Sequence, residues 1–233
     1  MERSANCQNV DNYTMLSRYY DELLQDEEAL SLWLRYIEEE KFHTVLELAS
    51  GSGVMAGILK GKGYEVTASD ISEEMRGVSR ENYDGEYLIL NMADYSLNRK
   101  YDLILCICDS INYLYEEELK GFFECACRHL HKGGRLIFDM HHPARIAEFA
   151  QQYIEEGYVK GVPYQWTIQS DEFEQALYEH FTFYTPEGMI QEHHMQNVFD
   201  PEKVKKIMSE WFTVEMHEDF VEEEKILTVG YRK

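Results

Sequence analysis

The 233-residue sequence is poor in basic residues, and this shortage excludes several kinds of partner. It contains 22 Lys and Arg against 44 Asp and Glu, which gives a formal net charge of -22. A surface of this charge repels phosphate backbones and anionic lipid headgroups over the range of the Debye length. The Lys and Arg residues form no run that would make a basic patch. We therefore expect neither nucleic acid nor a membrane to be a partner.

Long apolar segments are also missing. No apolar run approaches the ~20 residues that span a bilayer, and residues 1–7 lack the features of a signal peptide. These absences predict a cytoplasmic protein. The five cysteines include the pairs Cys106/Cys108 and Cys125/Cys127, in segments typical of a buried strand and a helix, so reduced thiols are expected. Residues two apart on a helix point to different faces, so we expect no zinc or other metal site.

After one or two amphipathic helices within residues 11–38, short β-rich runs alternate with helical patterns. This alternation predicts a parallel sheet with crossover helices. The expected strands are 44–48, 65–69, 87–90, 103–108 and 135–139, and the expected helices are 53–61, 73–81 and 116–130. Ser72 is placed to cap the second helix, and Lys132-Gly133-Gly134 to stop the third.

Beyond Pro143 and a short helical stretch the apolar pattern changes to period two, which predicts antiparallel strands. Val162, Tyr164, Trp166 and Ile168 share one face, and runs at 173–184 and 189–199 follow. The expected turns are 170–171 and 185–188. A helix should begin at Asp200-Pro201, and strands at 212–216 and 226–231 should complete the sheet.

The strongest local signal of chemistry is a strand that runs into a glycine turn, with the sequence Val-Leu-Glu-Leu-Ala-Ser-Gly-Ser-Gly at 45–53. Gly51 and Gly53 allow the backbone to approach a ligand, and the helix that follows presents its amides. Taken alone, residues 51–56 also satisfy the G-x-G-x-x-A dinucleotide fingerprint, with Asp70 about twenty residues further on. The glycine turn therefore leaves the ligand open.

Glu47 distinguishes between the ligands. At the end of the first strand, its carboxylate faces the place where a dinucleotide would put its pyrophosphate. Like charges ~4 Å apart cost about 4 kcal/mol at an effective dielectric of roughly 20. S-adenosylmethionine carries a sulfonium, an ammonium and no phosphate, so an acid near it is favourable. The alternative is that Glu47 caps amides of its own turn.

Two more acids follow the next two strands. Asp70 can accept hydrogen bonds from both ribose hydroxyls of an adenosine. Asp94 can accept from the adenine amino group while Met92 packs on the ring. Each acid alone would be an ordinary loop residue or helix cap, but three at the carboxyl edge of one sheet predict an adenosine site.

These motifs resemble the class I S-adenosylmethionine-dependent methyltransferases over nearly the whole chain. The family motif acid-x-G-x-G-x-G matches Glu47, Gly51 and Gly53, with Ala49 at its first glycine. Tyr13…Tyr20-Asp21, residues 108–114 and residues 133–139 resemble a bacterial small-molecule subgroup. The resemblance implies an α/β, Rossmann-like seven-stranded sheet of order 3-2-1-4-5-7-6 with an inserted antiparallel sheet. It also implies S-adenosylmethionine as cofactor, bound by Tyr13, Tyr20, Glu47, Ala49, Gly51, Gly53, Asp70, Ile71, Met92, Ala93, Asp94 and Cys108.

We expect a single methyltransferase domain over 1–233. Its parts are N-terminal helices (1–40), a cofactor-binding core (41–143), an inserted substrate lid (150–199) and a closing helix with strands six and seven (200–233). The expected reaction is methyl transfer to a small-molecule N or O nucleophile by a monomer or homodimer. The alternatives are an NAD(P)-dependent oxidoreductase and a non-catalytic cofactor-binding scaffold.

Residues beyond strand ends and on the inserted sheet are candidates for acceptor contact: Tyr113, His141, Trp166, His193 and His194. His142 is the candidate base. Each has a structural alternative, because aromatic residues at period two are usually core and adjacent histidines usually place one ring inside and one in solvent.

Overall fold

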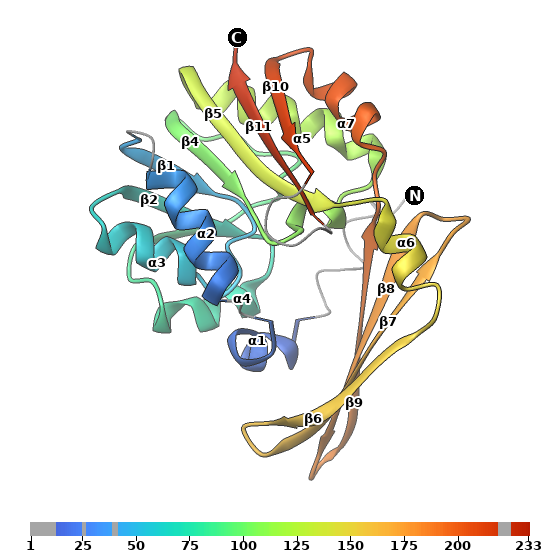
Figure 1. The fold of residues 1–233 in the computed structure, drawn as a ribbon. Coiled ribbons are helices and arrows are strands. Elements are labelled where there is room, and N and C mark those ends of the chain that lie inside the picture. The colour runs from blue at the N-terminus through green and yellow to red at the C-terminus, as the bar shows by residue number, and fades with distance from the viewer. Residues whose placement is uncertain (1–12, 25–26, 39–41, 219–224) are drawn as a thin grey trace, which may run out of the picture.

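The computed structural model describes residues 13–24, 27–38, 42–218 and 225–233, and it contains a seven-stranded and a four-stranded β-sheet (Figure 1). The larger sheet has the order β10-β11-β5-β4-β1-β2-β3, in which β11 runs antiparallel to both of its neighbours. In the order of its strands along the chain this is 3-2-1-4-5-7-6, as predicted. Its strands are β1 (Thr44–Glu47), β2 (Glu65–Asp70), β3 (Glu86–Ile89), β4 (Tyr101–Cys106), β5 (Leu130–His141), β10 (Phe212–His217) and β11 (Lys225–Arg232).

Helices cover both faces of this sheet (Figure 1). On one face, α2 (Glu27–Glu38) and α3 (Val54–Gly61) pack against Val45, Leu103 and Leu105. On the other, α5 (Glu116–His129) and α7 (Pro201–Met208) pack against Leu46 and Ile104. Successive strand residues point to opposite faces, so a sheet covered on both sides needs continuous apolar strands. The remaining helical segments are α1 (Leu16–Leu24), α4 (Glu73–Val78), α6 (Ala144–Glu148) and the 3-10 turns η3 (Ser79–Glu81) and η4 (Ser110–Tyr113).

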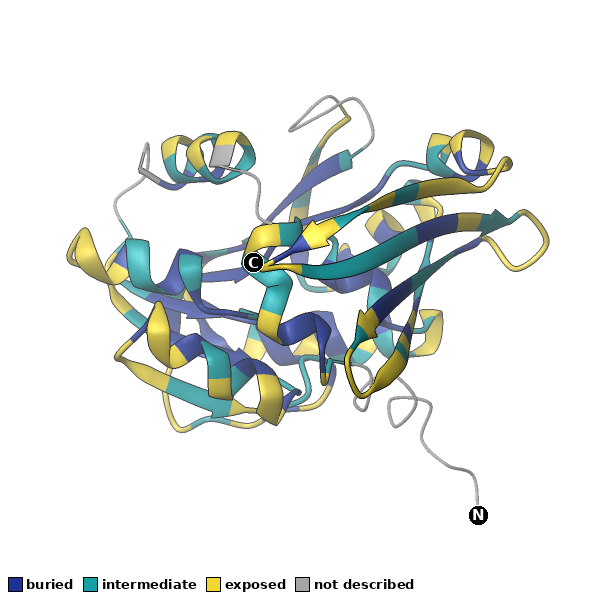
Figure 2. Ribbon diagram, turned by 90° about the horizontal axis from the view of Figure 1, so that it is seen from below, coloured by how far each residue is buried: buried dark blue, intermediate teal, exposed yellow. Residues whose placement is uncertain are grey.

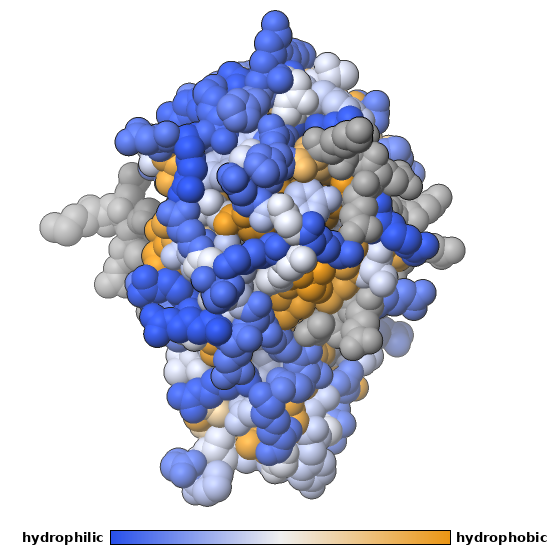
Figure 3. Space-filling model, turned by 90° about the vertical axis from the view of Figure 1, so that its left-hand side faces the viewer, coloured by the Kyte–Doolittle hydropathy of each residue, from blue (hydrophilic) through white to orange (hydrophobic). Residues whose placement is uncertain are grey.

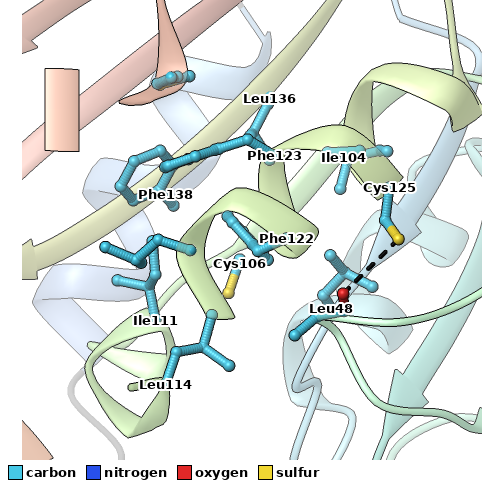
Figure 4. Packing of buried hydrophobic residues seen from close by; sticks show 14 of the residues in the cluster. Leu48, Ile104, Cys106, Ile111, Leu114, Phe122, Phe123, Cys125, Leu136 and Phe138 are labelled. Atoms are coloured by element: carbon cyan, nitrogen blue, oxygen red, sulfur yellow. Dashed lines mark hydrogen bonds between the residues drawn. The ribbon is translucent and has the colours of Figure 1, made fainter. Parts of the chain in front are cut away.

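Aromatic rings fill the space between the larger sheet and α5 (Figure 4). The centroids of Phe122 and Phe123 lie 5.3 Å apart, and both rings lie about 6 Å from that of Phe138 on β5. Cys125 is buried beside them with a free thiol. This layer fixes α5 on the central strands whose ends form the site.

The inserted sheet is an antiparallel meander of β6 (Tyr153–Val159), β7 (Val162–Asp171), β8 (Ala176–Thr185) and β9 (Gly188–Asn197). It projects away from the larger sheet (Figure 1), and exposed residues gather at its turns (Figure 2). Its inner face and α1 share a hydrophobic cluster that includes Leu16, Phe181 and Phe183. The cluster fixes α1 against the inserted sheet.

Three sequence predictions need correction here. Strand β6 was not predicted, because it is an edge strand in which Tyr153, Ile154 and Tyr158 are exposed and only Val159, at its end, is buried, so its apolar residues give no alternating pattern. The turn expected at 170–171 lies at 172–175, where the Asp171 carboxylate accepts hydrogen bonds from two backbone amides. The helix expected over 116–130 ends at His129, but the strand expected from 135 already begins at Leu130, so Lys132-Gly133-Gly134 form an irregular part of β5, with Gly133 at φ 81°, and do not stop the helix.

The predicted caps are confirmed. The Ser72 hydroxyl accepts from the Met75 amide at 3.1 Å, and the Asp200 carboxylate accepts from the Glu202 amide at 3.0 Å. On the face that Figure 3 shows, hydrophilic residues predominate and hydrophobic ones gather across its middle. Within the described part of the chain, no helix is long and apolar enough to cross a membrane.

Candidate active site

A cavity of about 440 Å³ lies where the carboxyl ends of β1, β2 and β4 meet α1 and the inserted sheet. It brings together residues from distant parts of the chain, as the sequence analysis expected for the carboxyl edge of a parallel sheet. The predicted site residues that line it are Tyr13, Tyr20, Glu47, Ala49, Gly51, Asp70, Ile71, Met92, Cys108, Tyr113, His141 and Trp166.

The glycine turn after β1 has a left-handed backbone at Ala49 (φ 52°), Gly51 (φ 53°) and Gly53 (φ 77°). An L-residue pays roughly 1–2 kcal/mol for this conformation, so Ala49 is strained where a glycine would not be. A Cβ on Gly51 would lie 3.7 Å from the Tyr20 ring. Gly53 does not line the cavity; it is the N-cap of α3 and packs against η3.

Asp70 is held by backbone amides at the end of β2. Its Oδ2 accepts from the Gly51 amide and its Oδ1 from the Ser72 amide, both at 3.0 Å. Each carboxylate oxygen can accept a further hydrogen bond on the cavity side. Burial raises the pKa of Asp70 above its ordinary value, and the amide hydrogen bonds oppose the shift. The two amides therefore hold the Asp70 carboxylate in one orientation at the cavity wall.

Glu47 is a buried carboxylate at the wall of the same cavity, and only 3% of it is exposed. Its Oε2 accepts from the Ser50 hydroxyl at 2.9 Å. Burial raises its pKa to about 8, although hydrogen bonds from Ser50 and the Ala56 amide lower it. No basic side chain of the described residues is among the groups that shift its pKa. A cationic ligand beside this buried acid would stabilise its ionised form, whereas a diphosphate would not, so the site fits S-adenosylmethionine.

The turn after β3 places Asn91, rather than Asp94, at the cavity. The Asn91 side chain accepts from the Ala93 amide at 2.8 Å, and the Asp94 amide donates to the Asn91 carbonyl at 3.1 Å. This tight turn buries Ala93 outside the lining and leaves Asp94 exposed. Asn91 was not predicted, because a carboxylate was the expected polar group at this strand end, although an asparagine close after a strand is also a signal.

The other end of the cavity holds a charged network that sequence reasoning missed. Asp109 Oδ2 lies 3.0 Å from Lys225 Nζ, and Asp109 Oδ1 lies 3.5 Å from Nδ1 of the buried His141. The His141 Nε2 lies 2.9 Å from Oε1 of Gln196 on β9. The Asp109 amide donates to Asp139 Oδ2 at 3.1 Å. The network therefore links η4, β5, β9 and β11.

Burial opposes the ionisation of Asp109, but Lys225 and His141 outweigh it and hold the pKa of Asp109 at about 2. Burial and the charge of Asp109 raise the pKa of Asp139 to about 7. Cys108 and Asp109 both have a left-handed backbone, at φ 61° and 58°. Strain of this kind at non-glycine residues gathers at functional sites.

The candidate base His142 and two of the acceptor candidates, His193 and His194, lie off the cavity lining. The Nδ1 of His142 accepts from the Ala144 amide at 3.1 Å, so its ring supports the start of α6 instead of facing the cavity, and its position does not favour a role as base. His193 is exposed and its ring contacts that of His180, with centroids 4.6 Å apart. His194 is buried with its ring centroid 4.7 Å from that of Tyr13. The 193–194 pair thus has one ring inside and one outside.

Residues 45–134 match the methyltransferase domain family. Two bacterial relatives are each named "Putative methyltransferase": GWCH70_2453 of Geobacillus sp. (strain WCH70), 24% identical over 91% of this chain and 93% of that protein, and YqeM of Bacillus subtilis (strain 168), 26% identical over 84% of both. A solved S-adenosylmethionine-dependent methyltransferase from Clostridium acetobutylicum ATCC 824 is similar, with a TM-score of 0.77, 22% identity, and coverage of 94% of this chain and 98% of that chain.

These matches agree with the predicted resemblance. The methyltransferase domain over residues 45–134 and the shared fold indicate an S-adenosylmethionine-dependent methyltransferase.

Proposed function

We propose that this enzyme methylates a nitrogen or oxygen nucleophile of a small molecule, and that both substrates bind in the single cavity described above. The observation that carries the proposal is that two kinds of residue line this one cavity. The first part of the lining consists of acids and the glycine turn of the larger sheet, and the second includes Tyr113, Trp166 and His141. A volume of about 440 Å³ lies in the ordinary range for small-molecule sites.

The residues of the first part suit the cofactor. Asp70 would accept the ribose hydroxyls, Ile71 and Met92 would pack on the adenine, and Asn91 offers polar atoms at its edge. Glu47 would lie near the cationic methionine end, with Tyr13 and Tyr20 of the N-terminal segment beside it. When bound, the cofactor supplies an electrophilic methyl group.

The chain's own task is alignment and the exclusion of water. Methyl transfer is an in-line displacement that gains most from fixed orientation of the two reactants. The inserted sheet contributes Trp166 and Gln196 to the lining of the cavity. We therefore assign the inserted sheet, within 150–199, to acceptor binding.

Solved relatives support a small acceptor. The sugar N-methyltransferase KedS8 from Streptoalloteichus sp. ATCC 53650 has a TM-score of 0.80, with 20% identity over 94% of this chain and 93% of that chain. The charge of -22 argues against a nucleic-acid acceptor. An oxidoreductase that uses NAD(P) is disfavoured, because Glu47 would meet its diphosphate.

The test is transfer of label from methyl-labelled S-adenosylmethionine into a small-metabolite extract, into nucleic acid and into protein. We expect label in one or few metabolites, with loss of the signal in Asp70→Ala. Label that enters nucleic acid or protein, with none in metabolites, would refute a small-molecule acceptor.

A further inference from the structure

Glu179 is an acid among apolar residues of strand β8 in the inserted sheet. The residues that alternate with it on the same face of β8 are Leu177, Phe181 and Phe183, and each is at most 1% exposed. Glu179 lines the cavity, and its Oε2 accepts a hydrogen bond from the Trp166 indole Nε1 at 3.0 Å. Glu179 is partly buried, and a carboxylate withdrawn from water costs free energy unless it is paired.

The charged side chains near Glu179 are paired with one another, so the Glu179 carboxylate is the acid that a ligand can bind. At this end of the cavity, Asp109 is paired with Lys225, and Arg145 with Glu148, both at 3.0 Å. Among the described residues, no ion pair includes Glu179, and its hydrogen bond is to a neutral indole. A positively charged group of the acceptor would complete it.

Aromatic rings surround this carboxylate. The rings of Trp166 and Phe181 stack with centroids 5.3 Å apart and an interplanar angle of 13°. Tyr13 and Tyr113 line the same cavity, and after burial it is the charge of Glu179 that does most to raise the pKa of the Tyr113 phenol. An ammonium group is attracted both to aromatic faces and to a carboxylate.

From this arrangement we propose that the acceptor is a primary or secondary amine on an apolar framework, that Glu179 binds its ammonium form between the aromatic rings, and that Glu179 takes the proton that frees the nitrogen lone pair. This inference rests on the proposed function. It specifies that the methylated atom is nitrogen rather than oxygen and that Glu179 is the base.

The step balances as follows. The ammonium gives one proton to the Glu179 carboxylate. The nitrogen lone pair then forms the N–C bond to the methyl group while the S–C bond breaks, and the electron pair of that bond stays on sulfur. The methylated ammonium and S-adenosylhomocysteine leave, and Glu179 releases its proton to water.

Burial raises the pKa of Glu179 to about 7, while the hydrogen bond from Trp166 lowers it. Among the charges nearby, Asp109 raises it and Arg145 and Lys225 lower it. A base with a pKa near neutrality is suited to proton removal at physiological pH. His194 on β9 is the cross-strand neighbour of Glu179. The other titratable groups that face Glu179 are Tyr13 before α1, Asp109 and Tyr113 at η4, Arg145 on α6 and Lys225 on β11.

The test uses the full ¹⁵N-labelled chain saturated with S-adenosylhomocysteine, and the probes are cyclohexylamine and the neutral cyclohexanol. Trp166→Phe identifies the Trp166 indole N–H resonance. The control for Glu179→Gln is Glu156→Gln. Glu156 is an exposed acid of the same sheet that accepts a hydrogen bond from the Gln165 side chain. In parallel, transfer of labelled methyl groups to panels of primary amines and of matched alcohols is measured.

We expect the Trp166 resonance to titrate with a midpoint near pH 7 and to shift with the amine but not with the alcohol. In Glu179→Gln both effects should vanish, and methyl transfer to amines should fall by about 10²–10⁴-fold, the usual contribution of a general base. Glu156→Gln should behave as wild type. An equal response to the alcohol, or wild-type rates in Glu179→Gln, would overturn the proposal. If S-adenosylhomocysteine failed to stabilise the wild type thermally, the proposed function itself would fail instead.

Discussion

The carboxylate of Glu192 on β9 accepts hydrogen bonds from the backbone amides of Met15, at 2.5 Å, and Leu16, at 3.0 Å. A residue of the inserted sheet thus holds the beginning of α1, although 176 positions separate Glu192 from Leu16. The amides at a helix start have no partner within the helix, so an acid there is favourable. The contact fixes the segment that carries Tyr13 and Tyr20 into the cavity.

Glu192→Ala should therefore lower the free energy of unfolding by roughly 1.5–3 kcal/mol, the range for a hydrogen bond to a charged group. It should also weaken S-adenosylhomocysteine binding, because Tyr13 and Tyr20 lose their support. Urea unfolding and calorimetric titration measure the two effects. Gln191→Ala, at the exposed neighbouring position, should change neither. Equal behaviour of the two variants would show that the contact is not needed.

Asp70→Ala should weaken cofactor binding by roughly 1.5–3 kcal/mol, since it removes the expected partner of the ribose hydroxyls. Asp70→Asn should lose less, because an amide oxygen still accepts. Affinities for S-adenosylhomocysteine test the order of the three proteins. Unchanged affinity in both variants would remove Asp70 from the cofactor site.

The pKa of Glu47 predicts a pH dependence. Burial raises it in the folded chain from 4.5 to about 8, so the folded state keeps a proton that the unfolded state loses. The corresponding stability is present below a pH of about 4.5 and is lost as the pH rises through about 8. Wild-type stability should therefore fall across this window relative to Glu47→Gln, as measured by urea unfolding. Parallel curves for the two proteins would contradict the raised pKa.

Two glycines of α3 should respond oppositely to alanine. A Cβ on Gly57 would lie 2.1 Å from the Asn82 carbonyl oxygen, whereas a Cβ on Gly61 meets nothing within 4 Å. Gly57→Ala should lower the free energy of unfolding by roughly 1–3 kcal/mol through overpacking. Gly61→Ala should raise it by up to about 1 kcal/mol through helix propensity. Thermal and urea unfolding check the sign of each change.

The sequence was sufficient for the features that local patterning controls. Continuous apolar strands, the caps Ser72 and Asp200, and the glycine turn identified the larger sheet and the end at which the site lies. The network of Asp109 and Lys225 depends instead on tertiary contacts between residues more than a hundred positions apart, which no local pattern records. Glu179 could have been noticed in the sequence. It lies two positions from both Leu177 and Phe181, so one acid interrupts the row of apolar residues on one side of β8. The structure does not favour His142 as the base, because His141, its neighbour in the sequence, lines the cavity and His142 does not.

The most direct test of the account is thermal unfolding of the wild-type protein with S-adenosylmethionine, S-adenosylhomocysteine, NAD or NADP. A ligand that binds only the folded state raises the midpoint by mass action. We expect the first two ligands to raise it in a concentration-dependent way, with a smaller rise in Asp70→Ala, and NAD and NADP to leave it unchanged. Stabilisation by NAD or NADP without stabilisation by S-adenosylmethionine would contradict the assignment of the cavity to this cofactor.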